Sequence, residues 1–295
     1  MNRFFTLILA VISLAGTTLA ADASAAKPRP VPAATFSEFH CTGFISSSRL
    51  PGETRVYNGA DDDLYEVLHT FISGDFVYLR RNGGQPFHVG EAYSLVRPEN
   101  GFLLDYKWSP GKIEKQILPP ASFYKFQRIA IQKLGYPYNN TGLVKVVKVT
   151  PQGAIAKVLF TCNGILAEDI AVPYEPESIP EYVPSAHQDR FAAPNGKLTG
   201  VIVADSHASP YLAKGSIAFL NIGQNQGVKP GQKFSIYAIF RDNVTKGLEG
   251  VVPPPATPRE TVGELVILHV KEKSAAGIVV KSARGIAIGD GVELE

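Results

Sequence analysis

The chain has 295 residues and a formal net charge of +2, from 29 basic and 27 acidic side chains. This balance gives no electrostatic support for binding to nucleic acid or to a strongly anionic surface. The length suits two domains, and the many Gly, Pro, Tyr and Phe residues beside a single Met favour a β-rich fold.

Residues 1–20 have the pattern of a secretory signal peptide. Arg3 is followed by an apolar core, Phe4 to Ala15, and by the small-residue cleavage site Thr18-Leu19-Ala20. Removing the signal takes away only the charge of Arg3, which changes the formal charge from +2 to +1. No later run is long enough to span a bilayer as a helix, so we expect a periplasmic protein without a membrane span after signal removal.

Residues 21–38 are rich in Ala and Pro and are predicted to form a flexible leader before the first β-domain, 39–173. Cys41 and Cys162, the only cysteines, lie in the predicted strands Phe39 to Ile45 and Lys157 to Cys162. In an oxidising compartment an even pair favours a disulfide, and two buried free thiols are the alternative.

Two segments of the first domain are not predicted to form strands. The run Asp61-Asp62-Asp63 lacks the alternating oxygens and distal acid of a calcium loop and is interpreted as a solvated loop, so no metal site is predicted. Ala121 to Leu134 is predicted to be a short helix, because Phe123, Phe126, Ile129, Ala130 and Leu134 form one apolar face.

The chain repeats itself. Gly74 to Val96 matches Gly215 to Tyr237 at a constant offset of 141, and the segment from Thr141 matches the segment from Val262 at an offset of 121. A third match aligns the opening Thr42-Gly43 with Thr199-Gly200 at an offset of 157. Three collinear matches indicate a duplicated β-domain.

The predicted fold is therefore mainly β, with two tandem antiparallel β-barrels or sandwiches at 39–173 and 197–295. The prolines of residues 174–196 indicate a semi-rigid linker between them. The turn and fold-defining residues predicted from the matches are Gly74, Gly90, Gly142, Gly164, Asp169, Gly215, Gly227, Gly231, Gly263, Gly285 and Asp290.

The second half resembles a known family. The pattern Asn221-x-Gly223-x-Asn225-x-Gly227, continued by Gly231, Phe234 and Ile288-Gly289-Asp290, is similar to the C-terminal β-domain of the flagellar assembly protein T and related secreted envelope modules, some of which accompany LysM domains. The resemblance covers about 100 residues well and the first half weakly. It implies a β-barrel with a structural or assembly role and no catalytic residue.

Candidate catalytic groups are sparse. Asp205-Ser206-His207 places three triad residue types together, but triad members converge from separate segments, so we interpret it as a polar loop. No HExxH or GxSxG motif occurs, and no cofactor is predicted.

Three hypotheses about function follow. The first is a non-catalytic envelope protein that binds another envelope protein or itself. The second is a peptidoglycan or glycan-binding module, for which Tyr106, Trp108 and the Tyr136 to Tyr138 pair offer stacking faces, although core packing is the simpler role. The third is an exported hydrolase with a pocket shaped by the insertion from Pro98 to Tyr138.

Overall fold

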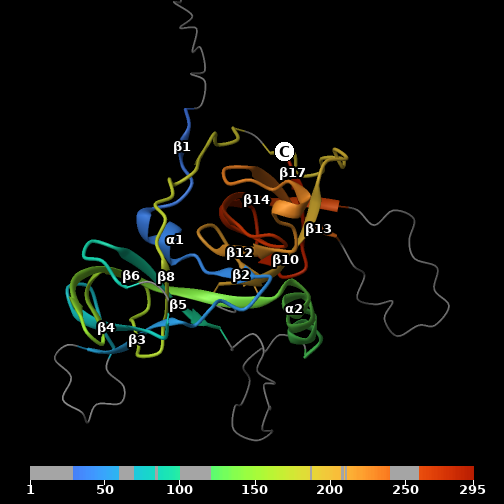
Figure 1. The fold of residues 1–295 in the computed structure, drawn as a ribbon. Coiled ribbons are helices and arrows are strands. Elements are labelled where there is room, and N and C mark those ends of the chain that lie inside the picture. Colours follow the sequence, from blue (N-terminus) through green and yellow to red (C-terminus); the bar gives the residue numbers. More distant parts are fainter. Residues whose placement is uncertain are drawn as a thin grey trace, which may run out of the picture.

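A computed structural model describes residues 29–59, 70–83, 86–99, 121–186, 188–206, 209, 211–239 and 259–295. It consists of two closed, antiparallel β-barrels of six strands each, which lie side by side (Figure 1). The predicted mainly-β fold with two tandem barrels is confirmed. Among the described residues, no helix combines the length and apolar character needed to cross a membrane.

The first barrel closes because β6 pairs with both β5 and β7. Its strands in ring order are β3 (Thr54–Gly59), β4 (Phe76–Arg81), β7 (Gly153–Thr161), β6 (Tyr136–Thr150), β5 (Ala92–Pro98) and β8 (Ile170–Pro173). The short strand β2 (Phe44–Ser46) adds to β6 outside the ring. Alternate strand residues point inward and form a buried apolar core.

The second barrel has the same ring order. Its strands are β10 (Thr199–Asp205), β12 (Ile217–Leu220), β15 (Ala275–Ser282), β14 (Arg259–Val270), β13 (Lys233–Ile239) and β17 (Gly291–Leu294). The 3-10 helix η1 (Gln224–Gln226) follows β12, and β11 (Tyr211–Leu212) pairs with β16 (Ile286–Ala287) beside the ring. A separate apolar core fills this barrel.

The register of the strands shows the duplication pair by pair. Leu79 pairs with Ala154 in the first barrel, and Leu220 pairs with Ala275 in the second, so offsets of 141 and 121 relate the two pairs. The β-bulges also fall at matching places in the corresponding strand pairs. A bulge shifts the register of every residue pair that follows it along the two strands. This agreement therefore identifies the barrels as copies of one domain.

The predicted alignment of the domain openings is wrong. The ring order makes β3, not β2, the counterpart of β10, because β3 lies between β4 and β8 as β10 lies between β12 and β17. Val56 pairs with Leu79 as Ile202 pairs with Leu220, which sets the offset at 146 rather than 157. The shared Thr-Gly-x-Ile residues misled the alignment because β2 is an extra strand outside the barrel.

The predicted disulfide joins Cys41 to Cys162, with 5.5 Å between the Cα atoms. However, Cys41 ends the helix α1 (Phe36–Cys41), not a strand. Thr35 caps this helix, and its side chain and that of Glu38 exchange bonds with each other's backbone N–H groups. The capping box starts a helix at the position where the alternation of the sequence indicated a strand. Closing a loop of this length stabilises the fold by about 5 kcal/mol in the chain-entropy model.

The leader and the linker are more ordered than predicted. From residue 29 onward the leader is structured: β1 (Val31–Pro32) pairs with β9 (Glu181–Tyr182) of the linker, and Ala33 and Ala34 are buried. The linker then runs along the second barrel, where the Gln188 side chain donates to the Gly263 carbonyl and the Arg190 guanidinium pairs with the buried Glu260. Prolines shape this segment, and hydrogen bonds fix its path.

A shared apolar core joins the barrels. It contains Phe39 of α1, Ile45 of β2, and Ile131 and Leu134 of the helix α2 (Ala121–Leu134), all packed against the outer surface of the second barrel. The predicted helix has the predicted bounds. Its buried face differs in part, because Ile129 is 40% exposed.

Candidate functional site

A cleft lies where the two barrels meet. It has a volume of about 320 Å³, and both barrels, α1 and the start of the linker line it. A neighbouring recess of about 630 Å³ shares three of its residues, Glu177, His269 and Lys271. Concave sites between domains that contain titratable groups are the first candidates for ligand binding.

His269 lines both the cleft and the recess and lies near the end of β14. A β-bulge between Ile267 and His269 interrupts the register there. The Nε2 atom lies 2.9 Å from the Phe39 carbonyl oxygen, and Nδ1 lies 3.1 Å from Oε2 of Glu177. Both partners are acceptors, so a doubly protonated ring satisfies both bonds. The ring also contacts the Phe39 ring in a tilted arrangement, with 4.3 Å between the ring centroids.

The electrostatics of the cleft affect two neighbours of His269. Burial lowers the pKa of His40, and the positive charge of His269 lowers it further, while Glu177 opposes the shift. The hydrogen bond from His269 lowers the pKa of Glu177 despite partial burial of the carboxyl group. The cleft therefore favours a neutral His40 beside an ionised Glu177.

The other polar groups of the cleft bind the segment around Cys41 to the two barrels. Asn140 of β6 donates to the carbonyl oxygens of His40 and Thr42, at 2.9 Å each. Outside the cleft lining, the buried Ser274 hydroxyl of the second barrel donates to the Ile45 carbonyl at 2.8 Å. Among the described residues that line the cleft, no hydroxyl or thiol hydrogen-bonds to the ring of His40 or His269. This arrangement locks the two barrels together and does not form a nucleophile–base pair.

A second candidate is convex. The outer face of β4, β7 and β6 on the first barrel, here called the open face, has aromatic, aliphatic and basic side chains. Phe76 and Leu159 are 38% and 48% exposed. The members of the open face are Phe76, Tyr78, Lys145, Ile155, Lys157 and Leu159.

The fold-defining residues predicted from the duplication lie at turns and close contacts. Gly142 and Gly263 occupy equivalent points, where an added Cβ would be 2.6 Å from the Phe160 carbonyl oxygen and 2.5 Å from that of Lys281. Gly285 has neither a positive φ nor a close neighbour. Six of the other predicted glycines have positive φ angles: Gly74, Gly90, Gly164, Gly215, Gly227 and Gly231.

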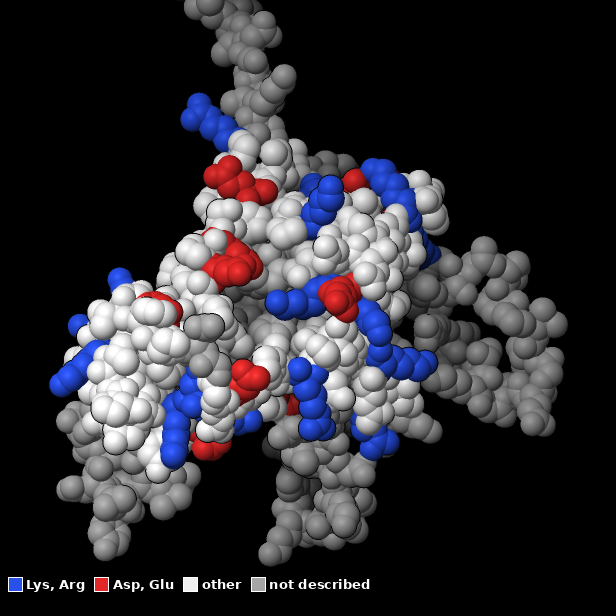
Figure 2. All heavy atoms as spheres, in the orientation of Figure 1, with Lys and Arg blue, Asp and Glu red and all other residues white. Residues whose placement is uncertain are grey.

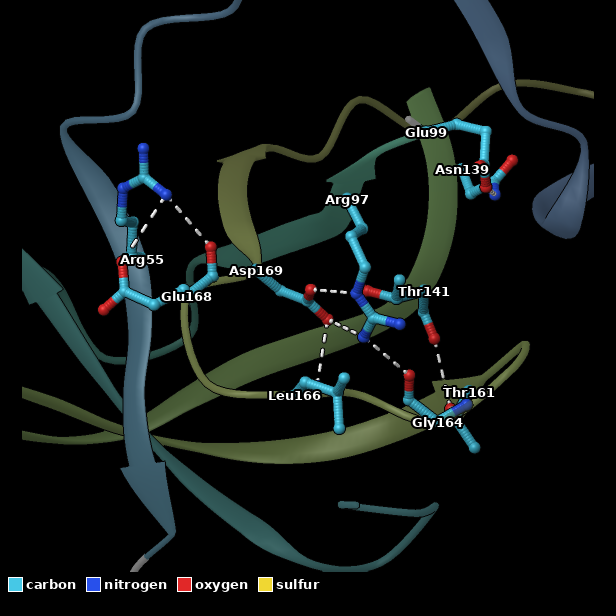
Figure 3. A network of polar contacts seen from close by, with 10 residues as sticks. All are labelled: Arg55, Arg97, Glu99, Asn139, Thr141, Thr161, Gly164, Leu166, Glu168 and Asp169. Carbon is cyan, nitrogen blue, oxygen red and sulfur yellow. Dashed lines mark hydrogen bonds and ion pairs between the residues drawn. The ribbon is translucent and has the colours of Figure 1, made fainter. Parts of the chain in front are cut away.

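Asp169 and Asp290 hold the same turn in each barrel. Asp169 accepts from the Leu166 N–H at 3.0 Å, and Asp290 accepts from the Ala287 N–H at 2.8 Å. Asp169, which is buried, also receives two bonds from the Arg97 guanidinium, at 2.7 and 2.8 Å (Figure 3). The second barrel has Ala238 at the position equivalent to Arg97.

Several predicted sites lie outside the described residues: the stacking candidates Tyr106 and Trp108, the run Asp61 to Asp63, and His207 of the Asp-Ser-His loop. Among the described residues, no group of three or more His, Cys, Asp or Glu side chains is arranged to hold a metal ion. His40, Glu177 and His269 were not predicted as a site, because they are far apart in the chain and no motif connects them.

No protein-family model matches the chain, and no curated protein matches it. The resemblance to the flagellar assembly module therefore remains a prediction from the glycine and turn pattern.

Proposed function

We propose that this protein is an exported, non-catalytic protein of the cell envelope with a structural or assembly role, which binds another protein through the open face. The signal-like pattern of residues 1–20 supports export. The resemblance of the second half to an assembly module supports the role.

One observation carries the proposal: other segments of the same chain cover the equivalent face of the second barrel. There, α1, β2 and α2 cover the outer side of β12, β15 and β14 and bury it in the core shared by the barrels. The first barrel has the same strands in the same register, but its outer face keeps large exposed apolar side chains. Exposed apolar surface of this kind marks interaction sites on folded proteins.

Site-specific photocrosslinking tests the proposal. A benzophenone amino acid replaces Leu159 on the open face in the full chain, expressed in its native cells. The matched control replaces Tyr211, which is 67% exposed on the second barrel. We expect a discrete covalent protein adduct from position 159 and none from position 211. Absence of an adduct at 159, or the same adduct at both positions, would contradict the proposal.

A further inference from the structure

We propose that the partner of the open face is an acidic protein segment, with apolar side chains that pack on Phe76 and Leu159 and carboxylates that pair with Lys145 and Lys157. This inference rests on the proposed function and specifies the chemistry of the partner. Three observations lead to it: the residue-by-residue correspondence between the outer faces of the two barrels, the side chains that cover the face of the second barrel, and the charges of the open face.

The register aligns the two faces position by position. Across the first barrel, Phe76 pairs with Lys157, which pairs with Lys145. The same line across the second barrel is Ile217, Ile278 and Val266, in the sequential pairs of the same ring. All three of these side chains are buried, at 7%, 3% and 0% exposure. The centre of this outer face is thus apolar in the second barrel, whereas in the first barrel it carries two lysines.

The cover of the second barrel shows what this curved sheet surface accommodates. Helix α2 contributes Ile131 and Leu134, the short helix α1 contributes Phe39, and β2 contributes Ile45. Apolar side chains from two helices and one strand thus cover the outer surface of the sheet. A partner that docks in the same way on the first barrel presents a row of large apolar residues.

The basic side chains of the open face lie in an unfavourable arrangement. Lys145 and Lys157 are directly opposite each other on β6 and β7. Like charges in opposing positions destabilise a sheet. Neither lysine forms an ion pair with a described residue. The pair therefore costs stability in the free protein, and carboxylates from a partner would relieve the repulsion.

The acidic groups at the edges of this face are already engaged. The Asp75 carboxylate accepts from the Ile72 N–H at 2.8 Å. The Glu91 carboxylate is bonded to His88 and Tyr93, at 2.9 and 2.7 Å. The outward positions Lys145, Lys157 and the neighbouring Lys148 leave this surface basic although the chain as a whole is nearly neutral. In Figure 2, basic side chains project from the outer end of the first barrel, at the left of the view.

Other occupants fit less well. A second copy of the chain would bring either another basic open face or the equivalent face of its second barrel, which its own chain covers. A lipid surface is anionic, but Lys157 lies between Ile155 and Leu159 in the middle of the apolar set, where insertion of the face would carry its charge into the bilayer. An acidic protein segment satisfies both the apolar and the basic groups.

The experiment repeats the photocrosslinking at position 159 in a chain that carries Lys145→Glu and Lys157→Glu. The matched control carries Lys197→Glu and Lys229→Glu, which change the same number of exposed lysines outside the open face. We expect Lys145→Glu together with Lys157→Glu to reduce the yield of the adduct by about tenfold or more, because the new carboxylates would face the carboxylates of the partner. The control should leave the adduct unchanged.

Each outcome separates the inference from the function on which it rests. If the adduct persists in Lys145→Glu/Lys157→Glu, a partner binds but acidic recognition is overturned. If the adduct is a lipid by mass spectrometry, a bilayer rather than a protein occupies the face, which overturns the inference. If the chain with the crosslinker at position 159 and both lysines unchanged gives no adduct, the proposed function itself fails.

A stability measurement detects a failure to fold. The single change Lys157→Glu places a carboxylate opposite Lys145, so it should leave the thermal midpoint unchanged or raise it by about 1–3 °C. The same change should weaken the adduct. A lower midpoint together with a weaker adduct would indicate simple misfolding and would contradict the inference.

Discussion

At the residue scale, His269 shows how single side chains connect distant parts of this chain. Its ring bonds to the carbonyl of Phe39, which lies 230 positions earlier, and to the carboxylate of Glu177 in the linker. Three segments thus meet on one imidazole. The nearby His40 remains close enough for its pKa to respond to the same charge.

This cluster predicts that acid weakens the junction. The folded state lowers the pKa of both His40 and Glu177, so the unfolded chain binds more protons than the folded chain as the pH falls. His40 contributes to stability at pH values above its usual pKa of 6.5, and this contribution is lost as the pH falls below 6.5. The contribution of Glu177 to stability is lost as the pH falls below its usual pKa of 4.5. Stability should therefore decrease on acidification.

Glu177→Gln provides the test. At pH 7.5 we expect a thermal midpoint lower by about 1–2 °C, since an exposed ion pair contributes little. Between pH 5 and pH 3.5 the variant should lose less stability than the wild type, because it lacks the carboxylate that must be protonated. Glu175→Gln, two positions earlier in the linker, is the control and should follow the wild-type curve. Parallel curves for Glu177→Gln and wild type would contradict the assignment.

At the scale of elements, close backbone contacts rather than turns alone fix the strand layout. Gly142 and Gly263 lie within the long strands β6 and β14, next to the turns held by Asp169 and Asp290. At each point the backbone and an isoleucine side chain from the turn leave no space for a Cβ. The duplicated pattern therefore includes contacts between strands and turns.

Gly263→Ala should destabilise the second barrel by about 1–3 kcal/mol, because the new methyl group would overlap the Lys281 carbonyl oxygen and force the strands apart. Gly285→Ala is the matched control: the site is open and φ is not positive, so the change should stay within about 0.5 kcal/mol. Urea denaturation of the full chain measures both. Equal effects of the two substitutions would show that the close contact is not what requires glycine at position 263.

At the scale of the whole molecule, the shared core makes the two barrels one unit. Residues of the leader, α1, β2, α2 and the linker pack on the second barrel, while the disulfide and Asn140 tie the same region to the first barrel. A force on one barrel is thus transmitted to the other through side chains. We expect a single cooperative thermal transition.

Ile131→Asp should break this coupling. Its side chain is fully buried between α2 and the second barrel, and an unpaired buried carboxylate there should cost about 3 kcal/mol or more and separate unfolding into two transitions. Ile129→Asp on the same helix is 40% exposed and should change stability by less than about 1 kcal/mol. Calorimetry distinguishes the two. A single, unshifted transition for Ile131→Asp would contradict the coupling.

The local features of the chain could be predicted because they depend on neighbouring residues. The offsets of 141 and 121 and the bounds of α2 follow from glycine positions and apolar periodicity. The strand predicted at Phe39 failed because a capping box outweighs alternation over so short a segment. The opening alignment failed because three shared residues cannot distinguish a barrel strand from an added one.

The sequence by itself determined the β-rich class, which follows from composition, and the duplication, which follows from repeated spacing. It favoured a disulfide between the two cysteines, and the structure shows the bond. Only the tertiary structure decided which outer face is covered and which is open, and it brought His40, Glu177 and His269 together. These properties depend on how curved sheets from distant segments pack. In each barrel, alternate strand residues point outward, but only the packing determines whether another layer covers them.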